Sequence, residues 1–173
     1  MLAVAFKEWA VVCRAVAEGR QRVILRKGGI SEVGGRFRPE HDRFWLYPTY
    51  FHEPQYRGVK PECAALLDDA EAARPPAGEL HLTHWAEVTG VEYVTDLDVL
   101  LALADAHVLS EETVRQRFAY RTPGLYVLGV SAWRAATPHV VPEKPEYAGC
   151  KTWVTLDAPL DTADSVAAPG GAS

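Results

Sequence analysis

The chain has 173 residues, of which 48% are apolar and 24% charged, and this predicts one globular domain with a hydrophobic core. Its 23 acidic and 18 basic side chains give a net charge of −5, which argues against a protein that coats nucleic acid nonspecifically. No stretch approaches the ~20 apolar residues of a membrane span, and Lys7 and Glu8 interrupt the apolar N-terminal segment that a secretory signal would need.

Apolar residues at helical spacing predict that the chain opens with an amphipathic helix, which Gly19 caps at its C-terminus. These residues are Phe6, Trp9, Ala10, Cys13, Val16 and Ala17. The run RVILRK at 22–27 predicts a strand, because β-branched residues stand at its centre and a glycine pair follows it. A glycine-rich loop continues through 34–35. The run FWLY at 44–47 predicts a second strand that ends at Pro48, because proline has no N–H for a ladder.

The residue pattern in the middle of the chain predicts a short helix followed by a long strand. Pro61 stands at an early helical position with an acidic residue beside it, and the proline-rich segment 74–78 ends this helix. Residues 79–94 alternate between apolar and polar side chains, which is typical of a half-buried strand. Gly90 is expected to bulge or bend that strand.

The last part of the domain predicts two capped helices and two closing strands. Asp96 and Ser110 are expected to begin the helices, and residues 125–133 and 153–156 form the strands. From 157 to 173 the sequence is small, polar and acidic, which predicts a disordered tail behind one domain over 1–156. Because no βαβ unit repeats, we expect an α+β fold, a small mixed and mostly antiparallel β-barrel with helices packed outside.

Half of the cations fall between residues 20 and 60, where nine Lys or Arg and four Asp or Glu give a net charge of +5. Aromatic residues are interleaved with them, and because cations hold phosphates while rings stack on bases, this run predicts a nucleic-acid-binding surface. The alternative is a solvated surface that protects edge strands from aggregation. The residues expected to position phosphates are Arg22, Arg26, Lys27, Arg36, Arg38, Arg43 and Lys151, and those expected to stack on a base are Trp45, Tyr47 and Tyr50.

The densest group of ionisable residues suggests a different function. It comprises Glu40, His41 and Asp42, followed by Glu53. Oxygen and imidazole ligands could bind a divalent metal, with His41 as a general base, so the alternative is a metal-dependent or nucleotide-acting hydrolase. Neighbouring side chains of an extended chain point to opposite faces, however, which favours ion pairs with nearby arginines.

The signatures of enzymes are missing from the sequence. It contains no GxxxxGK[ST], GxSxG or HExxH motif and no convincing PD…(D/E)xK pattern, so we expect a binding protein without metal or cofactor. Cys13, Cys63 and Cys150 are odd in number and far apart, which fits neither a disulfide framework nor a zinc site and indicates the cytoplasm. A third possibility is a protein-interaction module whose aromatic strand pairs with a partner chain.

Several motifs resemble an uncharacterised bacterial family known as domain of unknown function 1802. They are AFKEWAVV, LRKGGI, EHDRFWLYPTYFHE and PEYAGCKTWV, and they extend over nearly the whole chain up to Leu156. Some members of that family resemble partners or fusions of Mrr-type restriction endonuclease domains. The resemblance implies a restriction-modification or defence context and a restriction endonuclease partner.

The segment GRQRVILRK, after the predicted helix, is also similar to the opening of ASCH domains in the PUA-like superfamily. Such domains are small β-barrels that bind RNA or read modified bases in DNA, and the resemblance implies that Arg26 and Lys27 lie on the wall of the cleft. Some ASCH proteins are amidohydrolases with a Lys and a Thr in this motif, where the present chain has Gln21 and Ile24. The leading hypothesis is therefore a nucleic-acid-binding domain that reads modified or flipped bases.

Overall fold

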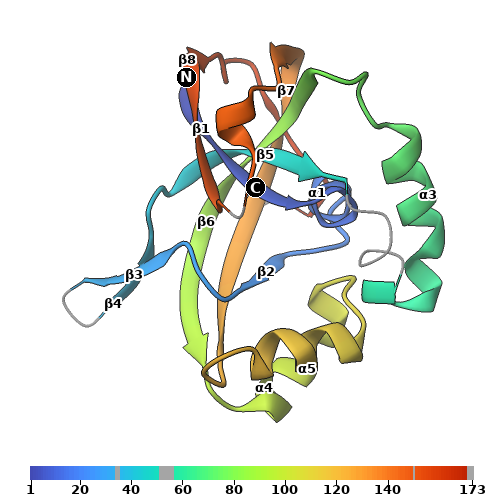
Figure 1. The fold of residues 1–173 in the computed structure, drawn as a ribbon, viewed down its shortest axis with the longest axis vertical. Coiled ribbons are helices and arrows are strands. Elements are labelled where there is room, and N and C mark those ends of the chain that lie inside the picture. Colours follow the sequence, from blue (N-terminus) through green and yellow to red (C-terminus); the bar gives the residue numbers. More distant parts are fainter. Residues whose placement is uncertain (34–35, 51–56, 150, 171–173) are drawn as a thin grey trace.

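The structure, a computed structural model, describes residues 1–33, 36–50, 57–149 and 151–170. One seven-stranded sheet dominates it, in the order β2-β7-β6-β5-β1-β8 with β9 paired to β7, and β3 and β4 form a separate two-stranded sheet (Figure 1). The strands are β1 (Leu2–Trp9), β2 (Val23–Arg26), β3 (Ile30–Val33), β4 (Arg36–Pro39), β5 (Arg43–Thr49), β6 (Glu79–Val94), β7 (Leu125–Pro142), β8 (Trp153–Leu160) and β9 (Val166–Ala167). The helices are α1 (Ala10–Ala17), α3 (Ala64–Ala72), α4 (Leu97–Leu101) and α5 (Glu111–Ala119), with 3₁₀ turns η1 (Pro61–Cys63), η2 (Ala104–Ala106) and η3 (Pro145–Tyr147).

The sheet is mixed, because β1 and β5 pair in parallel while its other pairs are antiparallel. The parallel register runs from Ala5 opposite Trp45 to Trp9 opposite Thr49. The carboxyl ends of these two strands therefore lie side by side. Strands β6 and β7 run the length of the molecule, and the β3–β4 hairpin projects away from the sheet (Figure 1).

Local signals in the sequence place several elements correctly. The side chain of Asp96 accepts a hydrogen bond from the N–H of Asp98 at the start of α4, and that of Ser110 accepts one from the N–H of Thr113 at the start of α5. Gly90 lies where the β6–β7 register shifts, as expected for a bulge. No helix in the described ranges is long and apolar enough to cross a membrane.

The prediction that a helix begins at Phe6 is wrong, because residues 2–9 form β1 and the helix begins only at Ala10. Both faces of β1 are covered. Phe6 packs 4.9 Å from Phe44 in the main core, whereas the neighbouring Ala5 is buried in a second cluster with Trp45. A strand buried on both faces has no alternation of polar and apolar residues, so its apolar run resembles a helix.

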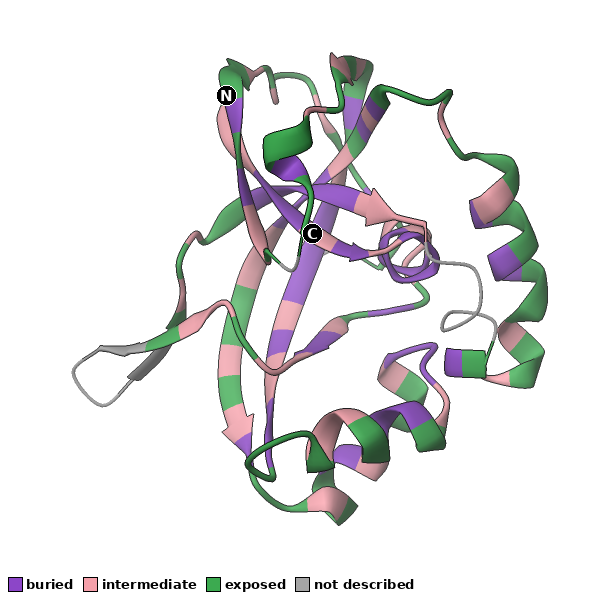
Figure 2. Ribbon diagram, viewed as in Figure 1, coloured by how far each residue is buried: buried purple, intermediate pink, exposed green. Residues whose placement is uncertain are grey.

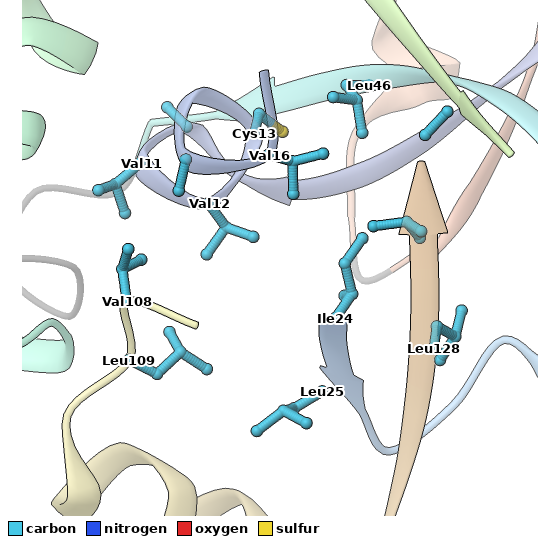
Figure 3. Packing of buried hydrophobic residues seen from close by; sticks show 14 of the residues in the cluster. Val11, Val12, Cys13, Val16, Ile24, Leu25, Leu46, Val108, Leu109 and Leu128 are labelled. Carbon is cyan, nitrogen blue, oxygen red and sulfur yellow. The ribbon is translucent and has the colours of Figure 1, made fainter. Parts of the chain in front are cut away.

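The main hydrophobic core lies between α1 and the sheet. Figure 2 shows α1 buried at the centre of the molecule, and Figure 3 shows Val12 and Val16 of this helix close to Ile24 of β2 and Leu128 of β7. Helix α3 buries Leu66 and Leu67 and exposes its remaining face. Burial of such side chains stabilises the fold by about 1.5–3 kcal/mol each.

The structure corrects the expectation of a closed barrel. In the described part of the chain the sheet ends at β2 and β8, and no backbone ladder joins these two edges. Side chains bridge them instead. A terminal nitrogen of Arg26 donates to Oγ1 of Thr152 at 2.9 Å, and Nε1 of Trp153 donates to the carbonyl oxygen of Gly29 at 3.1 Å. The fold is of the α+β class, and its curled, mostly antiparallel sheet stays open between the edges of β2 and β8.

Other boundaries also differ from the predictions. β5 does not end before Pro48 but continues to Thr49. β6 pairs only with residues 43–45 of β5, so the missing N–H of Pro48 removes no hydrogen bond to β6. The segment predicted as a glycine-rich loop includes β3 and β4, although residues 34–35 lie outside the described part. β7 and β8 run on to Pro142 and Leu160.

The disordered tail predicted from residue 157 is instead ordered as far as residue 170. β9 adds to β7, and the N–H of Ala168 donates to the carbonyl oxygen of Ala132 at 2.8 Å. The side chain of Ala168 is buried in the main core. Small residues permit this segment to lie close against α1, since a Cβ at Gly19 would stand 2.0 Å from the carbonyl oxygen of Pro169.

Candidate nucleic-acid interface

A cavity of about 1220 Å³ opens beside the carboxyl ends of β1 and β5. Segments far apart in the sequence line it: the ends of β1, β2 and β5, one residue of α5, the stretch 74–80 after α3, and the stretch 143–151 that contains η3. The parallel pairing of β1 with β5 brings the first of these segments together. The cavity is thus a product of the tertiary structure and not of one motif.

A buried carboxylate flanked by two guanidinium groups forms part of the cavity lining. The side chain of Glu8 is only 2% exposed, and its two oxygens lie 3.2 Å from Arg26 and 3.8 Å from Arg117. The Arg117 guanidinium also lies 4.6 Å from the centre of the Trp9 ring. Burial lowers the pKa of Arg117, the Glu8 carboxylate opposes that shift, and Arg26 adds to it.

These three side chains carry a net charge of +1 in a place that water reaches poorly. Two guanidinium groups share one carboxylate, and each arginine side chain is 21% exposed. Further hydrogen bonds hold them, from Arg26 to Thr152 and from Arg117 to the carbonyl oxygen of Leu25 at 3.0 Å. A buried charge without a full counter-charge is unfavourable, so this site can gain free energy by accepting an anion.

The lining as a whole carries an excess of positive charge. Six cations face three carboxylates, which gives the cavity a net charge of +3 in a chain whose total is −5. The cations are Lys7, Arg26, Arg74, Arg117, Lys144 and Lys151, and the carboxylates are Glu8, Glu79 and Glu143. A concave surface lined by one sign of charge concentrates the opposite ion, so an anionic ligand is favoured here.

Three aromatic rings also line the cavity, and each has a cation close to it. Besides Trp9 with Arg117, the guanidinium of Arg74 lies 5.2 Å from the centre of the Tyr50 ring, and the ammonium of Lys7 lies 5.5 Å from that of Tyr47. Burial is the main cause that raises the pKa of Tyr50 to about 12. Rings and cations in alternation are what binding of an unpaired nucleotide needs.

The wall formed by residues 143–149 is held by hydrogen bonds from the sheet. The Lys7 ammonium donates to the carbonyl oxygens of Tyr147 and Gly149 at 2.6 and 3.0 Å. The hydroxyl of Tyr47 donates to Oε1 of Glu143 at 2.8 Å. Burial and then this hydrogen bond raise the pKa of Tyr47, so its hydroxyl remains a donor at neutral pH.

Four of the predicted binding residues line this cavity: Arg26, Tyr47, Tyr50 and Lys151. The Lys151 side chain is exposed, and its ammonium donates to the carbonyl oxygen of Glu146 at 2.9 Å. Arg26 lies on the cavity wall.

Lys27 and Trp45 have structural positions instead. The ammonium of Lys27 donates to the carbonyl oxygens of Phe118 and Thr122, and Lys27 does not line this cavity. The Trp45 ring is fully buried and donates from Nε1 to the carbonyl oxygen of Leu2 at 3.2 Å. A ring with no exposed surface cannot stack on a base.

The remaining predicted cations lie away from the cavity. Arg22, Arg38 and Arg43 are exposed and are not part of its lining, and Arg43 pairs with Glu87 at 3.3 Å. The side chain of Arg36 lies outside the described part of the structure. The basic run of residues 20–60 is therefore spread over several surfaces.

The alternative hydrolytic cluster does not assemble among the described residues. His41 lies 3.8 Å from Glu40, but its ring packs edge-on against Trp153, and neither residue lines the cavity. Within the described ranges no group of three His, Cys, Asp or Glu side chains is placed to hold a metal. Glu53 lies outside them.

The most informative cavity residues escaped the sequence analysis. Lys7, Glu8 and Trp9 are consecutive at the end of β1, and Arg117 comes from α5. A signal was present, because Glu8 and its neighbour Lys7 are charged residues within a mostly apolar strand. A buried carboxylate requires a partner. Sequence alone could not identify Arg26 and Arg117 as those partners.

Comparisons with known proteins bear on the family and the fold. The family model described as "Domain of unknown function (DUF1802)" matches residues 5–169. Among solved structures, ASCH from Zymomonas mobilis is similar, with a TM-score of 0.50 and 16% identity over 88% of this chain and 86% of that one. Two mutant forms of it give TM-scores of 0.48 at 15% identity, covering 88% of this chain and 88% and 87% of theirs. No curated protein matches the chain. The likeness confirms an ASCH-like fold.

Proposed function

The chain belongs to the family described as Domain of unknown function (DUF1802), and we propose that in this member the cavity binds a segment of single-stranded nucleic acid. The observation that carries the proposal is the buried group of Arg26, Glu8 and Arg117, whose net positive charge lies beside the Trp9 ring. An anion with an attached flat ring satisfies both features at once. A nucleotide is such a ligand.

The contacts follow from the chemistry of the lining. Phosphate oxygens accept hydrogen bonds from guanidinium and ammonium groups, and this electrostatic attraction supplies most of the affinity. Bases stack on Trp9 or Tyr50, whose rings are only partly buried, and stacking is worth about 1–3 kcal/mol per base; Tyr47 is buried and does not offer its ring face. The volume of about 1220 Å³ exceeds the ~300–1,000 Å³ of ordinary small-molecule pockets, so more than one nucleotide fits.

The likeness of the fold to ASCH favours RNA over DNA as the ligand. The ASCH-like fold is one of the PUA-like folds, which are often tied to RNA binding, and this supports RNA as the first ligand to test. The reading of modified or flipped bases and the restriction endonuclease partner stay predictions. A duplex with one unpaired base extends the test to the reading of flipped bases, because an extruded base offers the cavity the same phosphate and ring as a single strand does.

The direct test is fluorescence anisotropy with labelled six-nucleotide RNA and DNA strands at two salt concentrations. We expect binding that weakens as salt rises. Replacing Lys151, an exposed cation of the lining, with Ala should weaken binding a few-fold and reduce the salt slope by about 0.7, the value for one phosphate contact on a single strand.

Arg43→Ala is the matched control, because it removes one exposed cation that lies outside the lining. It should leave both the affinity and the salt slope unchanged. The proposal fails if neither RNA nor DNA binds at low salt, or if Arg43→Ala weakens binding as much as Lys151→Ala does.

A further inference from the structure

We infer that Glu143 makes this cavity selective for guanine over other bases. The inference rests on the proposed function and adds the chemical identity of the preferred nucleotide. It concerns a carboxylate of the lining, whereas the proposed function depends on the cations and rings.

One carboxylate oxygen of Glu143 is held by a hydrogen bond, and the other is free to accept a hydrogen bond from a ligand. Oε1 accepts the hydrogen bond from the hydroxyl of Tyr47, a residue that is 3% exposed. In the described part of the structure no protein donor meets Oε2, and the side chain as a whole is exposed on the cavity lining. The carboxylate is thus oriented on one side and open to a ligand on the other.

The backbone around Glu143 is also constrained. Its N–H donates to the carbonyl oxygen of Gly78 at 2.9 Å, which ties the two lips of the cavity together. Pro142 precedes it and Pro145 follows two residues later, and the proline rings restrict the backbone at both places. A group fixed in this way loses little conformational entropy when a ligand binds, which favours selectivity.

Neighbouring cations do not neutralise this carboxylate. The ammonium of Lys144 pairs with Asp157, and that of Lys7 donates to the carbonyl oxygens of Tyr147 and Gly149. Among the described residues Glu143 therefore has no ion-pair partner, although the cavity as a whole is positive. Such a group must meet hydrogen-bond donors and not acceptors.

An ionised carboxylate only accepts hydrogen bonds, and each oxygen has two lone pairs, so Oε1 can accept a second bond beside that of Tyr47. Guanine offers two adjacent donors on its Watson–Crick edge, N1–H and the N2 amino group. Uracil and thymine place carbonyl oxygens on both sides of their single N–H, and these oxygens repel the carboxylate. Discrimination of this kind needs both the matched donors and the repulsive contact.

The sharpest test compares guanine with hypoxanthine, the base of inosine, which lacks only the N2 amino group. Anisotropy with six-nucleotide strands should show that the wild-type protein binds the guanosine strand about tenfold more tightly than the inosine strand, as expected for a hydrogen bond to a charged group. In Glu143→Gln the ratio should fall close to one, because the amide replaces one acceptor with a donor.

Glu79→Gln is the matched control. It removes a carboxylate of the same lining that interacts with His81 at 2.8 Å, so it changes the cavity charge equally. It should keep the tenfold ratio. Equal binding of the two strands by the wild type, or a tenfold ratio that persists in Glu143→Gln, overturns the selectivity and leaves the proposed function standing. Absence of binding to every strand overturns both.

Discussion

His107 should make the stability of this protein depend on pH between about 4 and 6.5. The residue is 4% exposed, Nδ1 accepts a hydrogen bond from the N–H of Leu109 at 3.2 Å, and Nε2 is buried with no partner among the residues that the structure describes. Burial lowers the pKa of His107 from 6.5 to about 4, and the charges of Lys60 and Arg117 add to this shift. The imidazole is therefore neutral in the folded protein at pH 5.

The magnitude follows from linkage between protonation and folding. At pH 5 the unfolded chain binds nearly one proton at His107, whereas the folded chain binds almost none. Stability is therefore fully present above the unfolded pKa of 6.5 and is lost as the pH falls towards about 4. The loss between pH 7 and pH 5 is about 2 kcal/mol, and it approaches about 3 kcal/mol below pH 4.

Urea unfolding followed by tryptophan fluorescence at pH 7 and pH 5 measures this loss. His107→Asn is the comparison, because its amide oxygen can still accept from the N–H of Leu109 but does not titrate. The wild type should lose about 2 kcal/mol more than the variant between the two pH values. Equal losses in both proteins would refute the reasoning.

Three further substitutions test other parts of the structure by urea unfolding. Gly19→Ala should lower the free energy of unfolding by about 2–3 kcal/mol, because φ is +72° and the new Cβ would meet Pro169. Gly78→Ala, with φ at +85° and open space around it, should lower it by only about 1 kcal/mol. Equal losses would contradict the close packing of the C-terminal segment. Glu8→Gln should destabilise the free protein by about 3 kcal/mol, since two guanidinium groups lose their shared carboxylate, and should tighten binding of single strands; a variant as stable as the wild type would contradict the buried charge. Lys27→Met should lower stability by about 1 kcal/mol through its two lost carbonyl contacts but keep the wild-type affinity for single strands, and a loss of affinity would return Lys27 to the binding surface.

Much of the secondary structure was predictable because its signals are local. The alternation over residues 79–94 identifies β6 with its observed bounds, and the side chains of Asp96 and Ser110 cap helices as expected. Each of these features depends on neighbours within a few residues. β1 was mistaken for a helix because burial on both faces removes the alternation that identifies a strand.

The candidate site was predictable only in part. Arg26, Tyr47 and Tyr50 of the basic aromatic run line the cavity, as does the distant Lys151. Trp45 stands two positions before Tyr47, and both are buried in the second core cluster, but only Tyr47 also lines the cavity. Sequence could indicate that β5 carries several rings, but not which of them lines the cavity.

The sequence by itself determined the class of the fold and an excess of positive charge among aromatic residues. The tertiary structure alone decided where that charge acts. Glu8 of β1, Arg117 of α5 and Glu143, which follows β7, are far apart in the chain, and the fold brings them to one cavity. The physical reason is that burial depends on which elements pack together, and burial brings Glu8 and its two guanidinium partners out of water.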